Sequence, residues 1–368
     1  MNDKTWQTRL YETMDFFRDI VARIIRLYSL KNFRDKGWLW SIAIFVVTLS
    51  VILTGVGLYW SREPASLHAR EVALEKANGD PSKIVPGFTI TAVLIKEAET
   101  LLDKPGGYLS NDRLPPASFF GLFSILDNIP NWEFGALVMI RDTSRVMRND
   151  FSRSQSQSRE NDALAQAEPL FHFPNDSWLF PPTEREYRKA IKYTSDYLDR
   201  LASHTDTDTQ FFTRADNLNV LLAIIEKRLG NLTQRLNASV EELRVNTDLA
   251  GDSAAQQSTR SPGLIVSKTP WLEIDDVFYE ARGYVWALLN TLRAVEVDFN
   301  NVLQKKNAVA SLQQVIRLLE QAQVPPSSPM VLNGAPMGWV ANYSKALVSY
   351  ISPANAAIID LRNLLTTG

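Results

Sequence analysis

The segment from Trp38 to Trp60 contains no charged residue and consists almost entirely of apolar residues. Its 23 residues would form a helix of roughly 35 Å at about 1.5 Å per residue, which is enough to cross a bilayer with some tilt. Aromatic residues typical of membrane–water interfaces lie at both ends, namely Trp38, Trp40, Tyr59 and Trp60. No small-x-small cleavage site follows, so the pattern predicts an uncleaved transmembrane helix rather than a signal peptide.

Basic residues are more numerous before this segment than after it. Those before it are Arg23, Arg26, Lys31, Arg34 and Lys36, and those after it are Arg62, Arg70 and Lys76. By the positive-inside rule the N-terminus is expected in the cytoplasm. The predicted organisation is a cytoplasmic segment (1–37), a transmembrane helix (38–60), a Pro- and Gly-containing tether (61–87) and a folded outer domain (88–368).

Residues 5–30 have the pattern of an amphipathic helix. Apolar residues recur every three or four positions from Trp6 to Tyr28, while charged residues such as Glu12 and Arg23 fall on the other side. The pattern predicts a helix that lies on the inner leaflet or packs on a partner protein.

Two later segments show heptad spacing of their apolar residues, from Phe211 to Leu243 and from Ile274 to Val302. They predict long helices over 208–245 and 272–303, packed through these seams against each other or against a second copy. Shorter helices are expected over 89–103 and from Ser352-Pro353 onward. Strand patterns are few. The predicted fold is mainly α, a membrane-anchored elongated helical bundle with long heptad-bearing helices.

Residues 119–126, FFGLFSIL, are apolar on every side but too short to span a bilayer. The favoured interpretation is core burial. The alternative is an exposed segment that dips into the outer leaflet or meets a partner.

Composition excludes several classes of site. The chain has no cysteine, so disulfides, thiolate metal sites and a cysteine nucleophile are excluded. A formal net charge of −2 gives no support to nucleic-acid binding. The three histidines are widely spaced, and the common phosphate-loop, zinc-protease, hydrolase-elbow and EF-hand motifs are missing. No cofactor is therefore implied.

Glu273, Asp276 and Glu280 share one face of a predicted helix and could form a carboxylate site for acid–base or cation chemistry. The favoured interpretation is a solvated first turn, where acids are stabilised by the helix dipole. Asp206 and Asp208 resemble a metal-binding DxD motif, but they precede a helix, where capping is the more common role.

Glu296 lies at the edge of the second apolar seam, where Arg293 or Arg282 could reach it. A structural ion pair is favoured there over catalysis.

Several stretches of the chain have distinctive sequences: LLDKPGGYLSND (101–112), IPNWEFG (129–135), RNDFSRSQSQS (148–158), NTDLAGD (246–252), TPWLEIDDVFYEARG (269–283) and ISPANAAIIDLRNLL (351–365). They resemble a proteobacterial family of single-pass inner-membrane proteins known only as a domain of unknown function. The resemblance implies a location in the bacterial envelope, with residues 61–368 in the periplasm. It implies no activity.

Two classes of function fit these patterns. The favoured one is a non-enzymatic envelope scaffold or assembly protein that contacts membrane lipid and either another envelope protein or a second copy of itself. The alternative is a periplasmic hydrolase that uses carboxylates such as Glu273, Asp276 or Glu296 for acid–base catalysis.

Overall fold

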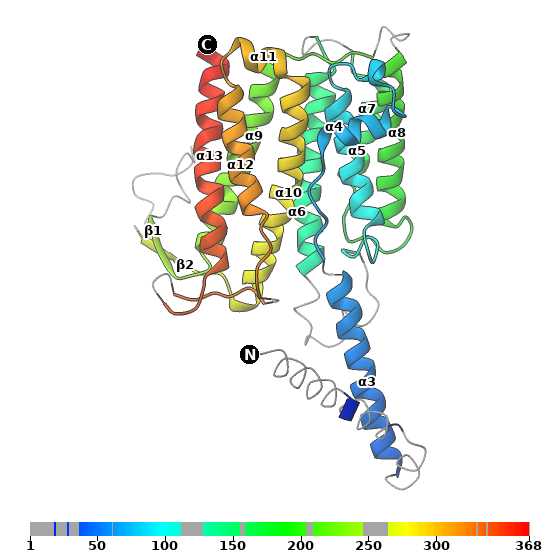
Figure 1. The fold of residues 1–368 in the computed structure, drawn as a ribbon, viewed down its shortest axis with the longest axis vertical. Helices are drawn as coiled ribbons and strands as arrows, with labels where there is room; N and C mark the ends of the chain where they lie inside the picture. Colours follow the sequence, from blue (N-terminus) through cyan, green and yellow to red (C-terminus); the bar gives the residue numbers. More distant parts are fainter. Residues whose placement is uncertain are drawn as a thin grey trace, which may run out of the picture. The chain divides into compact units, whose positions relative to one another are not determined.

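A computed structural model shows how the chain folds (Figure 1). It describes residues 18–19, 28, 37–60, 62–111, 128–154, 159–203, 209–245, 264–328, 330–335 and 338–367. The chain divides into two compact units, Met1–Tyr59 and Trp60–Gly368.

The first unit is described mainly by helix α3 (Gly37–Trp60), which contains no charged residue. Its large apolar side chains are exposed, with 71 % of Trp38 and 66 % of Phe45 accessible. The hydroxyls of Ser41 and Thr48 donate to the carbonyl oxygens four residues earlier, so these polar groups are satisfied within the helix. Among the helices described, none is long and apolar enough to cross a membrane. The transmembrane helix therefore stays a prediction.

The second unit is a helical bundle with one small sheet (Figure 1), which confirms the mainly α prediction. Its α-helices are α4 (Ala69–Lys76), α5 (Phe88–Asp103), α6 (Asn128–Val146), α7 (Asp162–Phe171), α8 (Thr183–Ser203), α9 (Ala215–Asn237), α10 (Ile274–Asp298), α11 (Asn300–Lys305), α12 (Val309–Ala322) and α13 (Tyr343–Thr367). Short helical turns are η1 (Pro81–Lys83), the π-turn η2 (Met147–Phe151) and η3 (Trp271–Glu273). Strands β1 (Glu242–Val245) and β2 (Leu264–Ser267) pair antiparallel.

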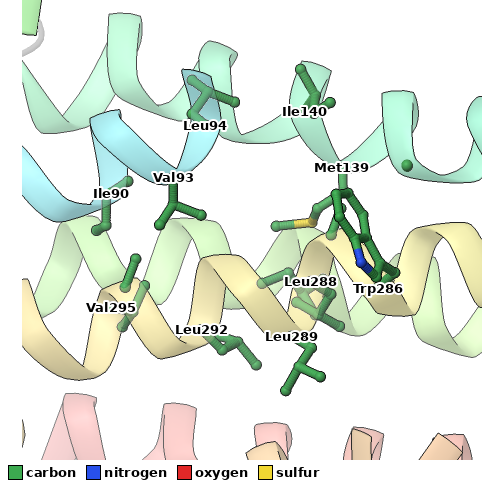
Figure 2. Packing of buried hydrophobic residues seen from close by; sticks show 14 of the residues in the cluster. Ile90, Val93, Leu94, Met139, Ile140, Trp286, Leu288, Leu289, Leu292 and Val295 are labelled. Carbon is green, nitrogen blue, oxygen red and sulfur yellow. The ribbon is translucent and has the colours of Figure 1, made fainter. Parts of the chain in front are cut away.

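Helix α10 is the centre of the bundle. It contacts α4, α5, α6, α9, α12 and α13, and none of its residues between Ile274 and Asp298 is exposed. Figure 2 shows part of this core, in which Leu288 and Val295 of α10 lie among side chains of α5 and α6. A helix without an exposed residue must be covered by neighbours on every side.

Two glycines allow α10 to approach α6 closely. A Cβ atom on Gly283 would lie 1.9 Å from the carbonyl oxygen of Trp132, and one on Gly135 would lie 1.9 Å from that of Glu280. Since real Cβ atoms do not come so near to backbone oxygens, each helix packs its backbone against the other only because both residues are glycine.

Helix α9 is shorter than the predicted segment 208–245. It begins at Ala215, and residues 242–245 form strand β1 instead of the last helical turn. It packs mainly against α13 and also contacts α6 and α10. The predicted pairing of the two heptad helices is therefore a minor contact, because each has a stronger neighbour.

The last helix, α13, begins ten residues before Pro353, which lies inside it. The prediction that Ser352-Pro353 starts this helix is wrong. Asn342 provides the missed start signal, since its side-chain oxygen accepts from Lys345 N at 2.8 Å as an N-cap.

Residues 62–87, expected to form a tether, belong to the second unit and pack on it. Ala69, Val72 and Ala73 of α4 are buried against the bundle. The backbone N–H of Leu67 donates to the side chain of Asn290 at 2.8 Å. The folded part of the chain therefore begins well before Gly87.

Some predictions lie outside the described residues: the apolar stretch 119–126, Asp206 and Asp208, and most of the amphipathic segment 5–30.

Candidate functional site

The N-terminal part of α10 carries the predicted carboxylates. Glu273 is exposed, whereas Asp276 and Glu280 are partly buried. This differs from the expected solvated turn, because α10 is covered on the side that faces α6 and α9. The three residues do not share one environment, so the structure separates their roles.

Asp276 has the more unusual environment. Asn131 of α6 donates to its carboxylate at 2.6 Å. Burial, together with the negative charges of Asp275, Glu273 and Glu280, raises the pKa of Asp276 to about 6. A carboxyl group with such a pKa can both hold and release a proton near neutral pH, which is a property of general acids and bases.

Glu280 forms an ion pair with Arg235 of α9. The two bonds from the guanidinium measure 2.5 and 2.7 Å, and only 15 % of the Glu280 side chain is accessible. Bidentate pairs of this kind are strong and geometrically specific. The acid is therefore used to join α9 to α10.

Glu296 and Arg293 lie near the other end of α10 and do not pair as predicted. Glu296 accepts from Gln313 of α12 at 2.8 Å, whereas Arg293 donates to Glu320 at 2.6 Å and to the carbonyl of Leu67 at 2.9 Å. A surface cavity of about 630 Å³ lies beside Glu296, between α4, α10 and α12. Its lining mixes apolar side chains with Arg70 and Gln313, without a gathered set of reactive groups.

The contacts of Arg282 differ most from the prediction, which had it as a possible partner of Glu296. Arg282 is 2 % exposed and holds Glu63 with two bonds of 2.7 and 2.6 Å. It also donates to the carbonyl oxygens of Ala322 and Val324, at 3.1 and 3.0 Å, at the C-terminal end of α12. One side chain therefore joins α10, α12 and the segment that follows α3. The available signal was an arginine four residues after Phe278 and three before Val285, both of which belong to the predicted apolar seam.

A second buried ion pair joins Lys104 to Glu133, and both side chains are almost completely inaccessible. Glu133 also accepts from the backbone N–H groups of Leu109 at 2.9 Å and Ser110 at 2.8 Å. Its carboxylate is thus surrounded by donors, which offsets the loss of water. These bonds connect the turn after α5 to the first turns of α6.

Glu97 of α5 is a third buried acid. Burial raises its pKa well above the usual value, and the hydroxyl of Thr291 donates to it at 3.4 Å. The group is expected to be neutral and to belong to the packing of α5 on α10. Within the ranges that the structure describes, no group of three His, Asp or Glu side chains could hold a metal ion.

The predicted interfacial aromatics lie at the two ends of α3. Trp38 and Tyr59 are 71 % and 52 % accessible, and Trp40 and Trp60 are partly covered. Aromatic rings at both ends of an apolar helix are typical of membrane interfaces.

Three of the segments quoted above meet in this part of the bundle. Residues 101–112 and 129–135 are joined by Lys104 and Glu133, and residues 129–135 and 269–283 are joined by Asn131 and Asp276. A sequence profile of uncharacterized proteins conserved in bacteria, DUF2333, matches residues 33–368. The chain belongs to the DUF2333 family. No curated protein and no solved structure matches it. The DUF2333 match itself names no reaction.

Proposed function

We propose that the chain is a non-enzymatic scaffold or assembly protein of the bacterial envelope. The observation that carries this proposal is the use of its acidic side chains: Glu280, Glu133 and Glu63 each hold an arginine or lysine from another segment. Such pairs fix the arrangement of helices, and they leave these acids unavailable for proton transfer to a substrate.

Anchoring in the inner membrane is the second part of the proposal. Its support is the uncharged sequence 38–60 and the large apolar side chains that α3 exposes. Exposed apolar surface of this extent is stable when lipid or protein covers it. The excess of basic residues before the segment supports a cytoplasmic N-terminus and a periplasmic bundle.

A scaffold needs a partner, which we propose to be another envelope protein or a second copy of the chain. Two segments are available for such contacts, the amphipathic sequence 5–30 and the apolar stretch 119–126. Neither has the composition of a nucleic-acid binding surface.

Crosslinking of the full chain in native membranes, with identification of the proteins that copurify, tests the scaffold role. We expect one partner, or the chain itself, in a constant ratio. Capture of no protein by the folded, membrane-bound chain would contradict the proposal.

Complementation of a deletion strain separates a scaffold from an enzyme. Glu280→Gln and Arg235→Gln remove the same ion pair from opposite sides, so a structural pair predicts that both variants lower growth and thermal stability. Arg235→Gln should be at least as damaging, because it leaves the less accessible Glu280 without its partner. Loss of activity only in Glu280→Gln, at matched stability, would favour a catalytic carboxylate.

A periplasmic hydrolase remains the second candidate, because the pKa of Asp276 is about 6. Under this alternative a well-folded Asp276→Asn variant would be inactive while its crosslinked partner is retained. Glu273→Gln and Glu296→Gln test the other two acids of this alternative, which lie outside the Asn131 contact. The scaffold proposal expects all three variants to complement.

Topology has its own test. Alkaline phosphatase fused after Leu365 should be active if residues 61–368 are periplasmic. Activity of a reporter that functions only in the cytoplasm, at the same position, would reverse the orientation.

A further inference from the structure

The most exposed apolar side chains of the second unit are unevenly distributed. Among its described residues, the large apolar side chains with at least 46 % accessibility all come from three segments between helices, and the remaining exposed ones reach no more than 41 %. These segments are called loops below, although the one before α10 includes β2 and η3. The residues of these loops, here called the apolar end, are Trp178, Leu179, Phe180, Val266, Trp271, Leu272, Val324, Met330, Trp339 and Val340.

The three loops lie at the same end of the bundle. The loop before α8 contacts the turn after α5, where Asn111 donates to the carbonyl of Ser177 at 3.0 Å. The segment before α10 and the loop before α13 both contact the C-terminal end of α9, through Thr269 and Asn333. Figure 1 shows the beginning of α10 and α13 and the end of α12 at this side of the bundle.

Hydrogen bonds hold the loops in shape while their apolar tips point outward. Ser177 donates to the carbonyl of Pro181 at 2.9 Å, and Asn333 donates to that of Ser239 at 2.7 Å. The backbone of Gly334 donates to Ala341 at 3.0 Å, which closes the turn that carries Trp339. The indole of Trp339 is fully accessible. The described parts of these loops therefore present the apolar side chains to the surroundings from a hydrogen-bonded backbone.

The segment that follows residues 38–60 enters the bundle at the same end. Glu63 is held by Arg282, and Arg282 also binds the carbonyl oxygen of Val324, one of the apolar-end residues. A bilayer crossed by residues 38–60 would thus lie close to the three loops. The tryptophans fit this position, since indole rings favour the boundary between headgroups and acyl chains.

We infer that the apolar end rests on the lipid surface, with Trp178, Phe180, Trp271 and Trp339 inserted at the headgroup boundary. This inference rests on the proposed anchoring through residues 38–60. The contact would hold the bundle in one orientation and leave its sides free for a protein partner.

The absence of cysteine from the sequence provides a clean test, because any introduced cysteine is the only one. Phe180→Cys, Trp271→Cys and Trp339→Cys in the full chain are each labelled with an environment-sensitive fluorophore. Asn363→Cys, an exposed position near the end of α13, is the matched control. The labelled chains are reconstituted in vesicles of phosphatidylethanolamine and phosphatidylglycerol with spin-labelled phosphatidylcholine.

We expect the spin-labelled lipid to quench the three apolar-end labels several-fold more strongly than the label at position 363, and aqueous iodide to show the opposite order. Labels that iodide reaches freely would overturn the inference. Labels protected from iodide but not quenched by lipid would also overturn it, because a second copy or a protein partner would then cover the apolar end.

Alkaline carbonate extraction of the same vesicles distinguishes this failure from failure of the proposed anchoring. A chain that resists extraction while its labels stay in water disproves only the lipid contact of the apolar end. A chain that carbonate removes disproves the anchoring itself.

Discussion

Helices α9 and α10 have similar heptad spacing but different environments. In α9 one stripe is buried, including Leu222 and Leu229, while residues such as Asn231 are exposed. In α10 no residue is exposed. Apolar spacing therefore predicts a helix and one buried face, but the number of neighbours depends on what occupies the other faces.

The other faces of α10 carry residues that permit close packing or make internal bonds. Gly283 admits the backbone of α6, Arg282 binds Glu63 and the end of α12, and Asn290 accepts from the backbone of Leu67. On α9, Arg228 pairs with the buried Asp142 of α6 but keeps 47 % of its own side chain accessible. Small and polar residues thus distinguish a central helix from a peripheral one.

Aspartate substitutions should show the largest effects. Ala287, Leu288 and Leu289 point to three faces of α10, and each is at most 1 % exposed. An aspartate at any of them places an unpaired charge in the core and should lower the free energy of unfolding by about 4 kcal/mol or more. Leu229→Asp in α9 should cost a similar amount, whereas Asn231→Asp should change stability by less than about 0.5 kcal/mol. Chemical denaturation measures all five variants. If one of the α10 variants unfolds with nearly the free energy of wild type, the face of α10 that carries this residue is accessible to solvent.

Gly283 of α10 and Gly230 of α9 provide a second test of the difference between these helices. Gly283→Ala introduces a methyl group 1.9 Å from the Trp132 carbonyl and should destabilise the protein by about 3 kcal/mol. Gly230 of α9 has only the side-chain nitrogen of Asn355 nearby, at 3.9 Å. Gly230→Ala should therefore stabilise the protein by about 0.5–1 kcal/mol through helix propensity. Equal effects in thermal denaturation would contradict the close approach of α6 and α10.

The sequence predicts local structure better than it predicts long-range contacts. Apolar periodicity locates α5 and α10 to within about five residues at each end, because it reflects the burial of one helix face. It also finds α9, but the observed helix begins at Ala215 and ends at Asn237, well inside the predicted segment 208–245. Arg282 and Glu63 are separated by 219 positions, so no local spacing relates them. Strand β1 was also missed, since Leu243 continues the heptad pattern although the backbone there pairs with β2.

The candidate site shows the same limit. Sequence reasoning found Asp276 and Glu280 as acids on one helix, but their environments come from Asn131 and Arg235 on two other helices. The apolar end was not predicted at all. Its local signals were the tryptophans of Ser177-Trp178 and Gly338-Trp339, which lie in Pro- and Gly-containing loops.

The C-terminal end of α10 should make stability depend on pH. Asp298 caps α5 by accepting from Ile90 N at 2.8 Å, and burial raises its pKa to about 7. Folded protein then keeps a proton that the unfolded chain loses above about pH 4, so this group lowers stability as the pH rises from 4 to 7.

Asp298→Asn keeps an acceptor but does not titrate. The free energy of unfolding of wild type, relative to that of Asp298→Asn, should therefore fall as the pH rises from 4 to 7 and level off above pH 7. Local opening of the helix end limits the change to about 2 kcal/mol. Tyr197, whose pKa is raised by burial and by Asp298, titrates above this window and does not obscure it. A constant difference from pH 4 to 8 would contradict the raised pKa.

The smallest effect is expected at the edge of α10, where Arg293 leaves the core and pairs with Glu320 of α12. Because the Glu320 side chain is 45 % accessible, water and salt screen this pair. Glu320→Gln should lower stability by about 0.5 kcal/mol in dilute buffer and by less at 1 M salt, since Arg293 keeps its bond to the Leu67 carbonyl. Glu63→Gln is the matched comparison, because it would leave Arg282 without its carboxylate partner at a site where the Arg282 side chain is 2 % accessible. Its effect should be several times larger and nearly independent of salt. Equal salt dependence of the two variants in denaturant titrations would show that the Arg282 site is open to solvent and that α10 is not covered on every side.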